Sequence, residues 1–415
     1  MSDAVAPVGF PQKYGVEWWY TAHLIYGAIQ LVFIPILIPT FVLDVTGSAT
    51  TVGLAMAVIG MGGLLAPVIG GLADKYRAHR FAQVGGLAAY ALGGLVFALI
   101  GTSTLGIFLG AACMGIGSAT LLMINPAFVV SGGFAPDDEA IRLTRLNQVM
   151  ILGSLVAGIG LSALTASGMG FAGRFITLSV LAVIGLVVAF MTNAEAAARI
   201  KVSDSGDDAG DAGGGVKALL LSPFGILLLA VFFVTTGQGA ITGQFPNYMN
   251  DVFGIAAGTS ALSLSVSALV SLLILDAVGR WMGRAGPSPV WIAAVVVKVV
   301  MMIGLSILAL SGGGIAAFIP LAFYILYLQA ITGVDMVQPA LAVRYSRAGA
   351  GMTQGFLMFA IASAYAAGNF IGGASADTLG FSSLTWLVGI VSAIALILGV
   401  ICFRNPGVND GDDDQ

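Results

Sequence analysis

The stretch LSVLAVIGLVVAFM, residues 178–191, is a continuous apolar run without a charged side chain. Similar runs recur along the chain, in which 58% of residues are hydrophobic, 9% are charged and the mean hydropathy is +1.00. Soluble domains carry roughly a quarter of their residues as charges. Because about 20 consecutive apolar residues are needed to cross a bilayer as a helix, these runs predict a polytopic α-helical membrane protein.

About twelve transmembrane helices are expected from these runs. Their expected limits are 19–43, 50–72, 81–101, 104–129, 143–165, 173–193, 219–246, 257–280, 289–310, 315–341, 352–374 and 381–403. Transmembrane β-barrels alternate apolar and polar residues in short strands, so the continuous runs exclude that class. Residues 1–16 hold two prolines and no apolar core, so no cleavable signal peptide is expected.

Lysine and arginine residues gather in alternate loops between the expected spans. If both termini are cytoplasmic, 14 of the 16 Lys and Arg residues lie on the cytoplasmic side, and the exceptions are Arg174 and Lys298. Positively charged loops are retained in the cytoplasm. We therefore expect a multi-pass protein of the plasma (inner) membrane with both termini cytoplasmic.

A polar segment rich in Gly, Ala and Asp, residues 194–217, interrupts the apolar runs near the midpoint and is typical of a flexible linker. On either side of it the sequence repeats. PTFVLDVTG at 39–47 matches PNYMNDVFG at 246–254 with an offset of 207, and MINPAFVV at 123–130 matches MVQPALAV at 336–343 with an offset of 213. The two halves are therefore expected to be parallel repeats.

The expected organisation has five parts. They are a cytoplasmic N-terminal tail at 1–18, a six-helix bundle at 19–193, a cytoplasmic linker at 194–217, a second six-helix bundle at 218–403 and an acidic cytoplasmic tail at 404–415. Parallel six-helix repeats with a binding site near the membrane midplane are one architecture of secondary transporters.

The segment GGLADKYRAHR, residues 70–80, resembles the cytoplasmic motif between spans two and three of the major facilitator superfamily. The family pattern is roughly Gly-x-Leu-Ala-Asp-Arg-x-Gly-Arg-Arg. With the expected spans and central linker, the resemblance covers essentially the whole chain. It implies an all-α polytopic fold of 12 transmembrane helices in two pseudo-symmetric six-helix bundles, and secondary active transport by alternating access.

The residue types of this motif suit a gate at the inner membrane surface. Gly70 and Gly71 would allow close helix approach, and Asp74 can accept hydrogen bonds at a helix N-terminus. The resemblance implies that Asp74 and Arg77 form a latch in the outward-open state. Anchoring by Lys75, Arg77 and Arg80 on the positive side explains the cations but leaves Asp74 unexplained.

A degenerate second copy of the motif is suggested by LDAVGRWMGRAG, residues 275–286, with Asp276, Arg280 and Arg284. Asp276 and Arg280 are four residues apart and share a helix face, so they are expected to pair. A similar Asp-x-x-x-Arg pair occurs in monocarboxylate transporters. A gate and an organic-anion site are therefore both open interpretations of these residues.

Asp335 is the one acid of the 20 that lies well inside an expected span. A charge at the bilayer centre costs about 2.5–3.5 kcal/mol, so such a residue faces a cavity or a partner. Gln329, Thr332, Asp335 and Gln338 recur every three residues and form a polar stripe. We expect the stripe to face a central cavity with Asp335 as the proton-coupling residue; the alternative is a structural pair between Asp335 and Lys298.

Other polar residues inside the expected spans are candidates for proton or substrate contact. His23 would suit a proton relay, although an interfacial hydrogen-bonded histidine is the alternative. Spans one, four, seven and ten line the cavity in the superfamily. The substrate-binding candidates are Gln30, Asn125, Gln148, Gln238, Gln244, Lys298, Gln329, Thr332 and Gln338. Helix–helix hydrogen bonding or, for Lys298, snorkelling explains these residues as well.

The expected function is transport of a small organic solute, coupled to protons, by a monomer embedded in the lipid bilayer. Transport of organic anions, efflux of amphipathic compounds and a non-transporting assembly or sensor role are the alternatives. AACMGIGSA at 111–119 has Ala111 where proton-coupled drug exporters carry Arg, which disfavours efflux. No metal spacing, phosphate loop or basic patch is present, so no enzyme, cofactor, metal or nucleic-acid partner is expected.

Overall fold

The computed structural model describes residues 15–200, 222–311, 314–346 and 350–404, and nearly all of these residues are helical. Within these ranges, 12 helical segments are long and apolar enough to cross a membrane, which confirms the expected number of spans. The expected N-terminal and C-terminal tails and most of the expected linker lie outside the described residues. The chain is therefore a multi-pass, all-helical membrane protein.

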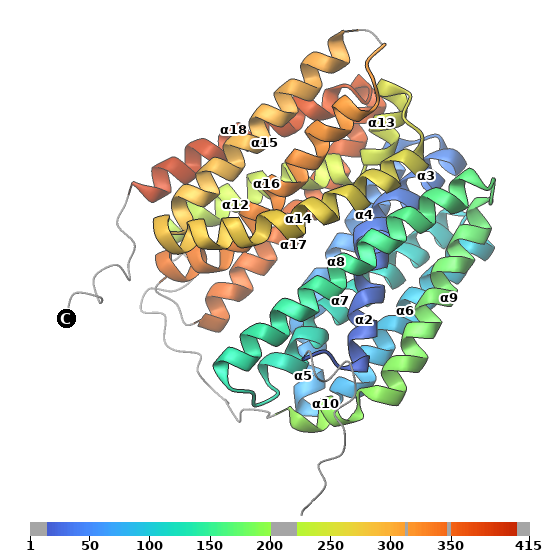
Figure 1. The fold of residues 1–415 in the computed structure, drawn as a ribbon. Coiled ribbons are helices and arrows are strands. Elements are labelled where there is room, and N and C mark those ends of the chain that lie inside the picture. Colours follow the sequence, from blue (N-terminus) through green and yellow to red (C-terminus); the bar gives the residue numbers. More distant parts are fainter. Residues whose placement is uncertain (1–14, 201–221, 312–313, 347–349, 405–415) are drawn as a thin grey trace, which may run out of the picture.

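The first half of the chain, blue to green in Figure 1, contains the first six spans, and the first two of them are interrupted by a turn of another helical type. Its helices are α2 (Thr21–Ala28), α3 (Ile34–Thr46), α4 (Ala49–Met61), α5 (Ala66–Lys75), α6 (His79–Ile100), α7 (Thr104–Val130), α8 (Pro136–Ala166), α9 (Phe171–Thr192) and the short α10 (Ala194–Arg199). A π-helical turn, Ile29–Phe33, joins α2 to α3, and a 3-10 turn, Gly62–Leu65, joins α4 to α5.

The second half contains the other six spans. Its helices are α12 (Pro223–Thr242), α13 (Phe245–Phe253), α14 (Ala257–Ala285), α15 (Pro287–Leu310), α16 (Phe318–Tyr345), α17 (Ala350–Leu379) and α18 (Ser383–Phe403). The expected seventh span, 219–246, is divided, because α12 ends at Thr242 and α13 begins at Phe245. Pro246 near the start of α13 lacks an N–H and suits the first turn of a helix, and a Cβ on Gly243 would collide with the side chain of Asn369.

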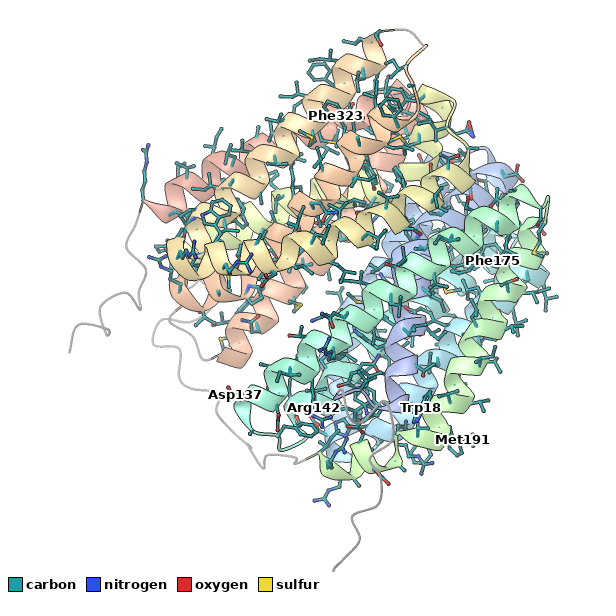
Figure 2. The ribbon with its side chains drawn as sticks, in the orientation of Figure 1. Trp18, Asp137, Arg142, Phe175, Met191 and Phe323 are labelled. Carbon is teal, nitrogen blue, oxygen red and sulfur yellow. The ribbon has the colours of Figure 1, made fainter. Side chains whose placement is uncertain are left out.

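The two ends of the helical bundle differ in charge. Of the 12 Lys and Arg residues that the structure describes, all but Arg174 and Lys298 lie at the end where α2 begins and α18 finishes. We call this the basic end; Trp18, Asp137 and Arg142 mark it in Figure 2, and Phe175 and Phe323 lie toward the opposite, far end.

The two halves meet at the far end and diverge toward the basic end (Figure 1). The main helix pairs that join them are α3 with α13, α4 with α17 and α8 with α14. Gln244 donates to the carbonyl of Ala49 (2.8 Å), and Asn247 donates to the carbonyl of Pro39 (3.1 Å). The halves are therefore closed against each other at the far end.

The sequence repeats occupy equivalent places in the backbone. Gly47 follows α3 with φ of +64°, and Gly254 follows α13 with φ of +66°, so each ends its helix in the left-handed conformation that glycine adopts readily. Pro126 and Pro339 lie inside α7 and α16, the fourth and tenth spans. The structure thus has the two-fold internal repetition expected from the sequence.

The beginning of the expected linker is ordered helix. Residues 194–199 form α10, which contacts α6, α7 and α9 of the first half, and Ala196 is buried. The six residues AEAAAR include four alanines, the residue with the highest helix propensity, which explains why this part of a polar segment is helical. Residues 201–217 of the expected linker lie outside the described part of the chain.

Glycines allow the backbones of α2 and α8 to touch. A Cβ placed on Gly27 would collide with the carbonyl oxygen of Met150, and one placed on Gly153 would collide with that of Leu24. Gly160, on the same helix as Gly153, has open space in the Cβ direction. The first half therefore depends on small residues at this crossing, as is common for helices packed in a membrane.

Substitution of Gly153 by Val is expected to lower the free energy of unfolding by about 1–3 kcal/mol or more, because an overpacked contact with backbone atoms cannot relax by side-chain rotation. The matched variant Gly160→Val, which adds the same side chain to α8 where there is room, is expected to be near neutral. Thermal unfolding of the two detergent-purified variants measures the difference, and equal midpoints would contradict the close crossing.

Candidate functional site

A cavity of about 590 Å³ lies between the two halves. The first half contributes residues of its first and fifth spans, and the second half contributes residues of α12, α13, α14, α16 and α17. The polar side chains that line it are Gln30, Asn147, Ser154, Gln238, Thr242, Ser267, Ser271, Tyr324, Thr332, Asp335 and Tyr365. The contacts at the far end close the cavity on that side, and it extends toward the basic end.

Gln30 lies in the π-helical turn Ile29–Phe33 and lines the cavity. A π turn displaces side chains from the regular helical register and often occurs at functional sites. The side-chain oxygen of Gln30 accepts hydrogen bonds from the hydroxyls of Ser118 and Tyr90, the latter at 3.3 Å. Its amide nitrogen has no protein partner among the described residues and remains available to a solute.

Asp335 lies midway along the bundle and lines the cavity. Although protein surrounds it deeply, its side chain is accessible to solvent through the cavity. Gln238 of α12 hydrogen-bonds the carboxyl group, so the two predicted residues come together. Thr332, one turn away on α16, lines the same cavity. The arrangement provides one carboxyl group among amide and hydroxyl groups.

Lys298 lies behind this wall of the cavity. It is fully buried, its ammonium group donates to the carbonyl of Val234 (3.1 Å), and it lies 5.4 Å from the centre of the Tyr327 ring. It interacts electrostatically with Asp335 but forms no ion pair with it in the described part of the chain. Lys298 does not line the cavity, and the tight pair considered from the sequence is not formed.

The expected polar stripe on α16 is divided between several environments. Gln329 is buried and bonds Ser267 and Ser271, which line the cavity. Gln338 is 1% exposed, and neither atom of its side-chain amide has a partner among the described residues. A three-residue spacing advances about 300° around a helix, so the residues of the stripe drift away from a single face.

The remaining candidates from the sequence lie outside the cavity. Gln244 is part of the far-end contact between the halves. Gln148 is exposed near the basic end and accepts from Arg145 (2.8 Å). Its neighbour Asn147 does line the cavity.

His23 and Asn125 belong to a buried polar network in the first half. The amide of Asn125 donates to Nδ1 of His23 (3.0 Å), and Gln83 donates to Asn125 (2.8 Å). Asn193 in turn donates to Gln83 (2.9 Å) and to the carbonyl of Arg80 (3.1 Å). This network connects α2, α7, α6 and the end of α9, and none of its members lines the cavity.

The motif at the basic end makes contacts within the first half only. Asp74 pairs with His79 (2.9 Å between Oδ1 and Nε2) and is largely exposed. Arg80 donates to the carbonyl of Phe190 (2.9 Å) and so fixes α6 to α9, and Lys75 lies 5.5 Å from the centre of the Tyr76 ring. The described contacts of Asp74 therefore do not include a residue of the second half.

The glycines of this motif differ in their surroundings, which corrects one expectation. A Cβ on Gly70 would collide with the side chain of Met123, whereas Gly71 is exposed with nothing near its Cβ direction. Close helix approach at this point therefore depends on Gly70 and not on Gly71, because only Gly70 faces α7.

Arg77 stands three residues after Asp74, where the family pattern has its second glycine. Its φ is +48°, and it is the only described residue other than glycine with a positive φ. A left-handed conformation costs a non-glycine residue about 1–2 kcal/mol, which explains the glycine of the pattern. The turn keeps its shape here without that glycine.

In the second copy of the motif, Asp276 and Arg280 form the expected ion pair one helical turn apart on α14, and both side chains are exposed. Arg284 is exposed near the end of the same helix. Exposed pairs of this kind contribute little to stability. None of the three residues lines the cavity.

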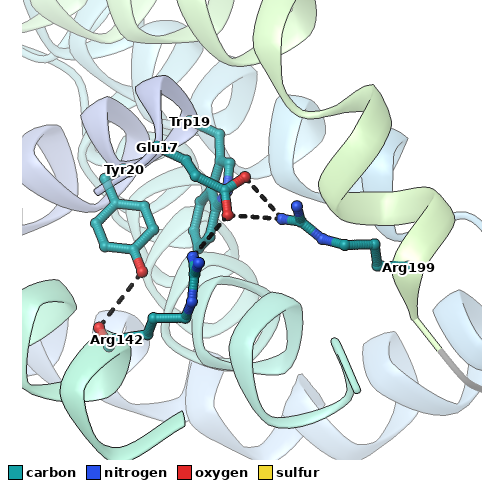
Figure 3. Close-up of polar contacts among 5 residues, drawn as sticks. All are labelled: Glu17, Trp19, Tyr20, Arg142 and Arg199. Atoms are coloured by element: carbon teal, nitrogen blue, oxygen red, sulfur yellow. Dashed lines mark hydrogen bonds and ion pairs between the residues drawn. The ribbon is translucent and has the colours of Figure 1, made fainter. Parts of the chain in front are cut away.

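Glu17 is the centre of a second group of charges at the basic end, shown in Figure 3. It accepts from Arg142 of α8 (2.9 Å) and from Arg199 of α10 (2.7 Å), and the Trp19 indole also donates to it (3.2 Å). The sequence alone did not indicate this cluster, because its members are far apart along the chain. It ties the start of the first span to α8 and α10.

Several cavity residues were missed from the sequence because they are common in any apolar helix. Tyr365 of α17 bonds the hydroxyl of Thr242 (3.2 Å) at the cavity wall, and Phe245 stacks on Tyr324 with ring centres 3.8 Å apart. Only the assembled fold places these aromatic side chains in the same cavity as Asp335.

The chain matches the family model described as Major Facilitator Superfamily over residues 19–343. It therefore belongs to the major facilitator superfamily and is a secondary transporter of small molecules and not an enzyme. No curated protein matches it significantly.

Solved structures with the same fold include a mutant of the nucleoside transporter NupG, with 13% identity, a TM-score of 0.75, and coverage of 93% of this chain and 99% of that chain. A POT family transporter in complex with 5-aminolevulinic acid has 14% identity, a TM-score of 0.74, and coverage of 96% and 98%. A mutant peptide transporter POT in complex with alafosfalin has 16% identity, a TM-score of 0.75, and coverage of 96% and 95%. At these identities the likeness concerns the fold.

Replacement of Gln83 by Leu is expected to lower the free energy of unfolding by about 1–3 kcal/mol, because it leaves the buried Asn125 oxygen without this donor. Gln148→Leu, which removes an exposed amide at the same end of the first half, is expected to change it by less than about 0.5 kcal/mol. Thermal unfolding of both variants provides the test. If the two substitutions cost the same, the buried network is not a stabilising element.

Proposed function

We propose that this protein transports a small neutral or cationic organic solute across the plasma (inner) membrane, coupled to protons through Asp335. The observation that carries the proposal is the position of Asp335. It is the only charged side chain among the residues that line the cavity, and it is hydrogen-bonded to Gln238. A carboxyl group at this depth can change its charge by exchanging a proton with water in the cavity.

The charge of the cavity favours some solutes over others. An anion would need a cationic group in the cavity, but Lys298 is buried behind the cavity wall, and Arg280 and His23 do not line the cavity. Amide and hydroxyl groups from both halves suit a polar, uncharged solute, and Asp335 suits an amine. This argument disfavours the organic-anion alternative. Nucleosides are one class to test, since NupG shares the fold.

The basic end is proposed to face the cytoplasm. Ten of the 12 described Lys and Arg residues lie there, as the positive-inside rule requires of cytoplasmic loops. Both termini would then be cytoplasmic, and the structure, closed at the far end, would represent the inward-open state. Residues 19–193 and 218–403 would be the two moving bodies, with residues 201–217 in the connection between them.

The motif at the basic end is proposed to act when that end closes. Asp74 is largely exposed and within reach of water, with only His79 as its described partner. This is the state expected of a latch that is open, because the outward-open state would bring the second half against it. Asp276 and Arg280, which pair with each other here, would form the related contact on α14.

A thermal-shift panel is expected to give stabilisation by a neutral or cationic polar compound and none by monocarboxylates. The panel comprises uridine, adenosine, glucose, alanyl-alanine, primary amines and lactate. A compound at 100 times its Kd stabilises the folded protein by about 2.7 kcal/mol. Stabilisation by lactate alone would show that the cavity prefers an anion, which contradicts the proposal. Stabilisation by amphipathic drugs alone would favour the efflux alternative.

The variant Asp335→Asn is expected to lose accumulation driven by a pH gradient but to keep exchange of a neutral compound that the panel identifies. One proton moving down one pH unit supplies about 1.4 kcal/mol, or tenfold accumulation, so the ratio should fall from about ten to about one. Asp276→Asn removes an exposed acid of the same half and should leave accumulation unchanged.

Proteoliposomes with the purified variants provide the measurement. Full accumulation by Asp335→Asn would exclude Asp335 as the coupling residue. The absence of exchange by folded wild-type protein for every compound would favour the non-transporting alternative.

A further inference from the structure

Asp377, in the last turn of α17, binds the beginning of α4 across the boundary between the two halves. One carboxylate oxygen accepts from the backbone N–H of Ala49 (2.7 Å), and the other accepts from the N–H of Thr50 (2.8 Å) and the hydroxyl of Ser48 (2.9 Å). Ala49 and Asp377, which the shortest of these bonds joins, are 328 positions apart in the chain. This is the densest set of hydrogen bonds between the halves in the described part of the chain.

The contact satisfies groups that a helix cannot satisfy itself. The first N–H groups of α4 have no partner within the helix. Ser48 already accepts from Thr51 (3.2 Å) as the N-cap residue, so Ala49 and Thr50 depend on an acceptor from outside. A carboxylate also interacts favourably with the positive end of the helix dipole. When the halves separate at the far end, both the charge interaction and the hydrogen bonds are lost.

The backbones of α4 and α17 touch beside this contact. A Cβ on Gly53 of α4 would collide with the carbonyl of Asn369, and one on Gly373 of α17 would collide with that of Ala49. Asp377 is thus held one turn beyond a backbone-to-backbone crossing. Its geometry is fixed by the closed far end and cannot persist if that end opens.

The second span and α17 run in opposite directions, so each ends beside the beginning of the other. The second span, Ala49–Lys75, carries Asp74 in its last turn at the basic end, and α17 carries Asp377 in its last turn at the far end. Asp377 caps the partner helix in this structure, whereas Asp74 is largely exposed. The same helix pair therefore carries one acid at each end. Among the described contacts, Asp377 binds the partner helix and Asp74 does not.

We propose that Asp377 is the positioning residue that locks the far end, as the counterpart of Asp74 at the basic end. The inference rests on the proposed alternating-access function and extends it. Asp377 caps α4 when the far end is closed, and it releases α4 when the basic end closes and Asp74 is engaged. The two acids stabilise opposite states, so removing either one shifts the equilibrium in the opposite direction from removing the other.

Spin-label distance measurements on the full chain in nanodiscs test this inference without a substrate. Cys113 and Cys402 are first replaced by Ser. One label pair, at Ser167 and Thr259, reports the far end, and a second pair reports the basic end from Ala140 and Ala285; all four label sites are exposed.

Asp377→Asn keeps the side-chain shape and is expected to raise the ratio of far-end-open to far-end-closed molecules about tenfold, equivalent to about 1.4 kcal/mol. Asp377→Ala should do the same. Asp74→Asn should lower the ratio, and the double variant Asp74→Asn/Asp377→Asn should lie between the single ones. The basic-end distances should change in the opposite sense.

Asp44→Asn is the matched control, because Asp44 is an exposed acid at the same end of the molecule with no described contact to the second half. Identical distance distributions for Asp377→Asn and Asp44→Asn would overturn the inference, whether both shift or neither does. A shift in Asp377→Asn of the same sign as in Asp74→Asn would also overturn it.

Exchange assays separate this inference from the proposed function. If wild-type protein exchanges solute but Asp377→Asn does not alter the distances, only the role of Asp377 fails. If the distances shift as expected while no solute is exchanged, the lock is supported and the transport proposal fails.

Discussion

A carboxyl group midway through a membrane protein needs solvent or polar partners, and the arrangement of the two halves provides both for Asp335. The cavity gives the side chain access to solvent, Gln238 hydrogen-bonds it, and Lys298 adds a positive charge from behind the wall. Lys298 is itself balanced by a backbone carbonyl and the Tyr327 ring. Asp335 can therefore lie at a depth where, in lipid alone, the low dielectric would make a charged side chain costly.

The same constraint shapes the rest of the bundle, because a polar group away from the cavity must find its partner on another helix. The network from His23 to Asn193 meets this need in the first half. Close crossings such as that of Gly27 with Met150 bring helices near enough for such bonds. Large apolar side chains such as Leu99 and Leu273 are left on the outside, where lipid covers them.

The number of spans and the internal repeat could be predicted because they depend on local features. Apolar runs set the spans, and Gly47 and Gly254 mark matching helix ends through a backbone conformation that glycine adopts readily. The division of the seventh span at Gly243 and the helix at 194–199 were missed, since tertiary packing decides whether such segments bend or remain helical.

The candidate site was predictable only in part. Asp335, Gln238, Gln30 and Thr332 were found because polar residues are rare in apolar spans, and the structure places all four in one cavity. The same signal selected His23 and Asn125, which bond each other instead. Sequence spacing gives the face of one helix but not which helix it meets. For that reason the contact of Asp377 with α4 could not be foreseen.

The repeat also shows where the two halves have ceased to be equivalent. Asn125 and Gln338 are matching residues, but Asn125 bonds His23, whereas the position 207 residues after His23 is Ala230 and Gln338 has no described partner. An unpaired buried amide costs about 1–3 kcal/mol. If the halves alternate as proposed, such a cost offsets part of the stabilisation at the far end only where Gln338 gains a partner when that end opens. A transporter needs this balance, because a state favoured by more than a few kcal/mol would hold nearly all molecules and slow the cycle.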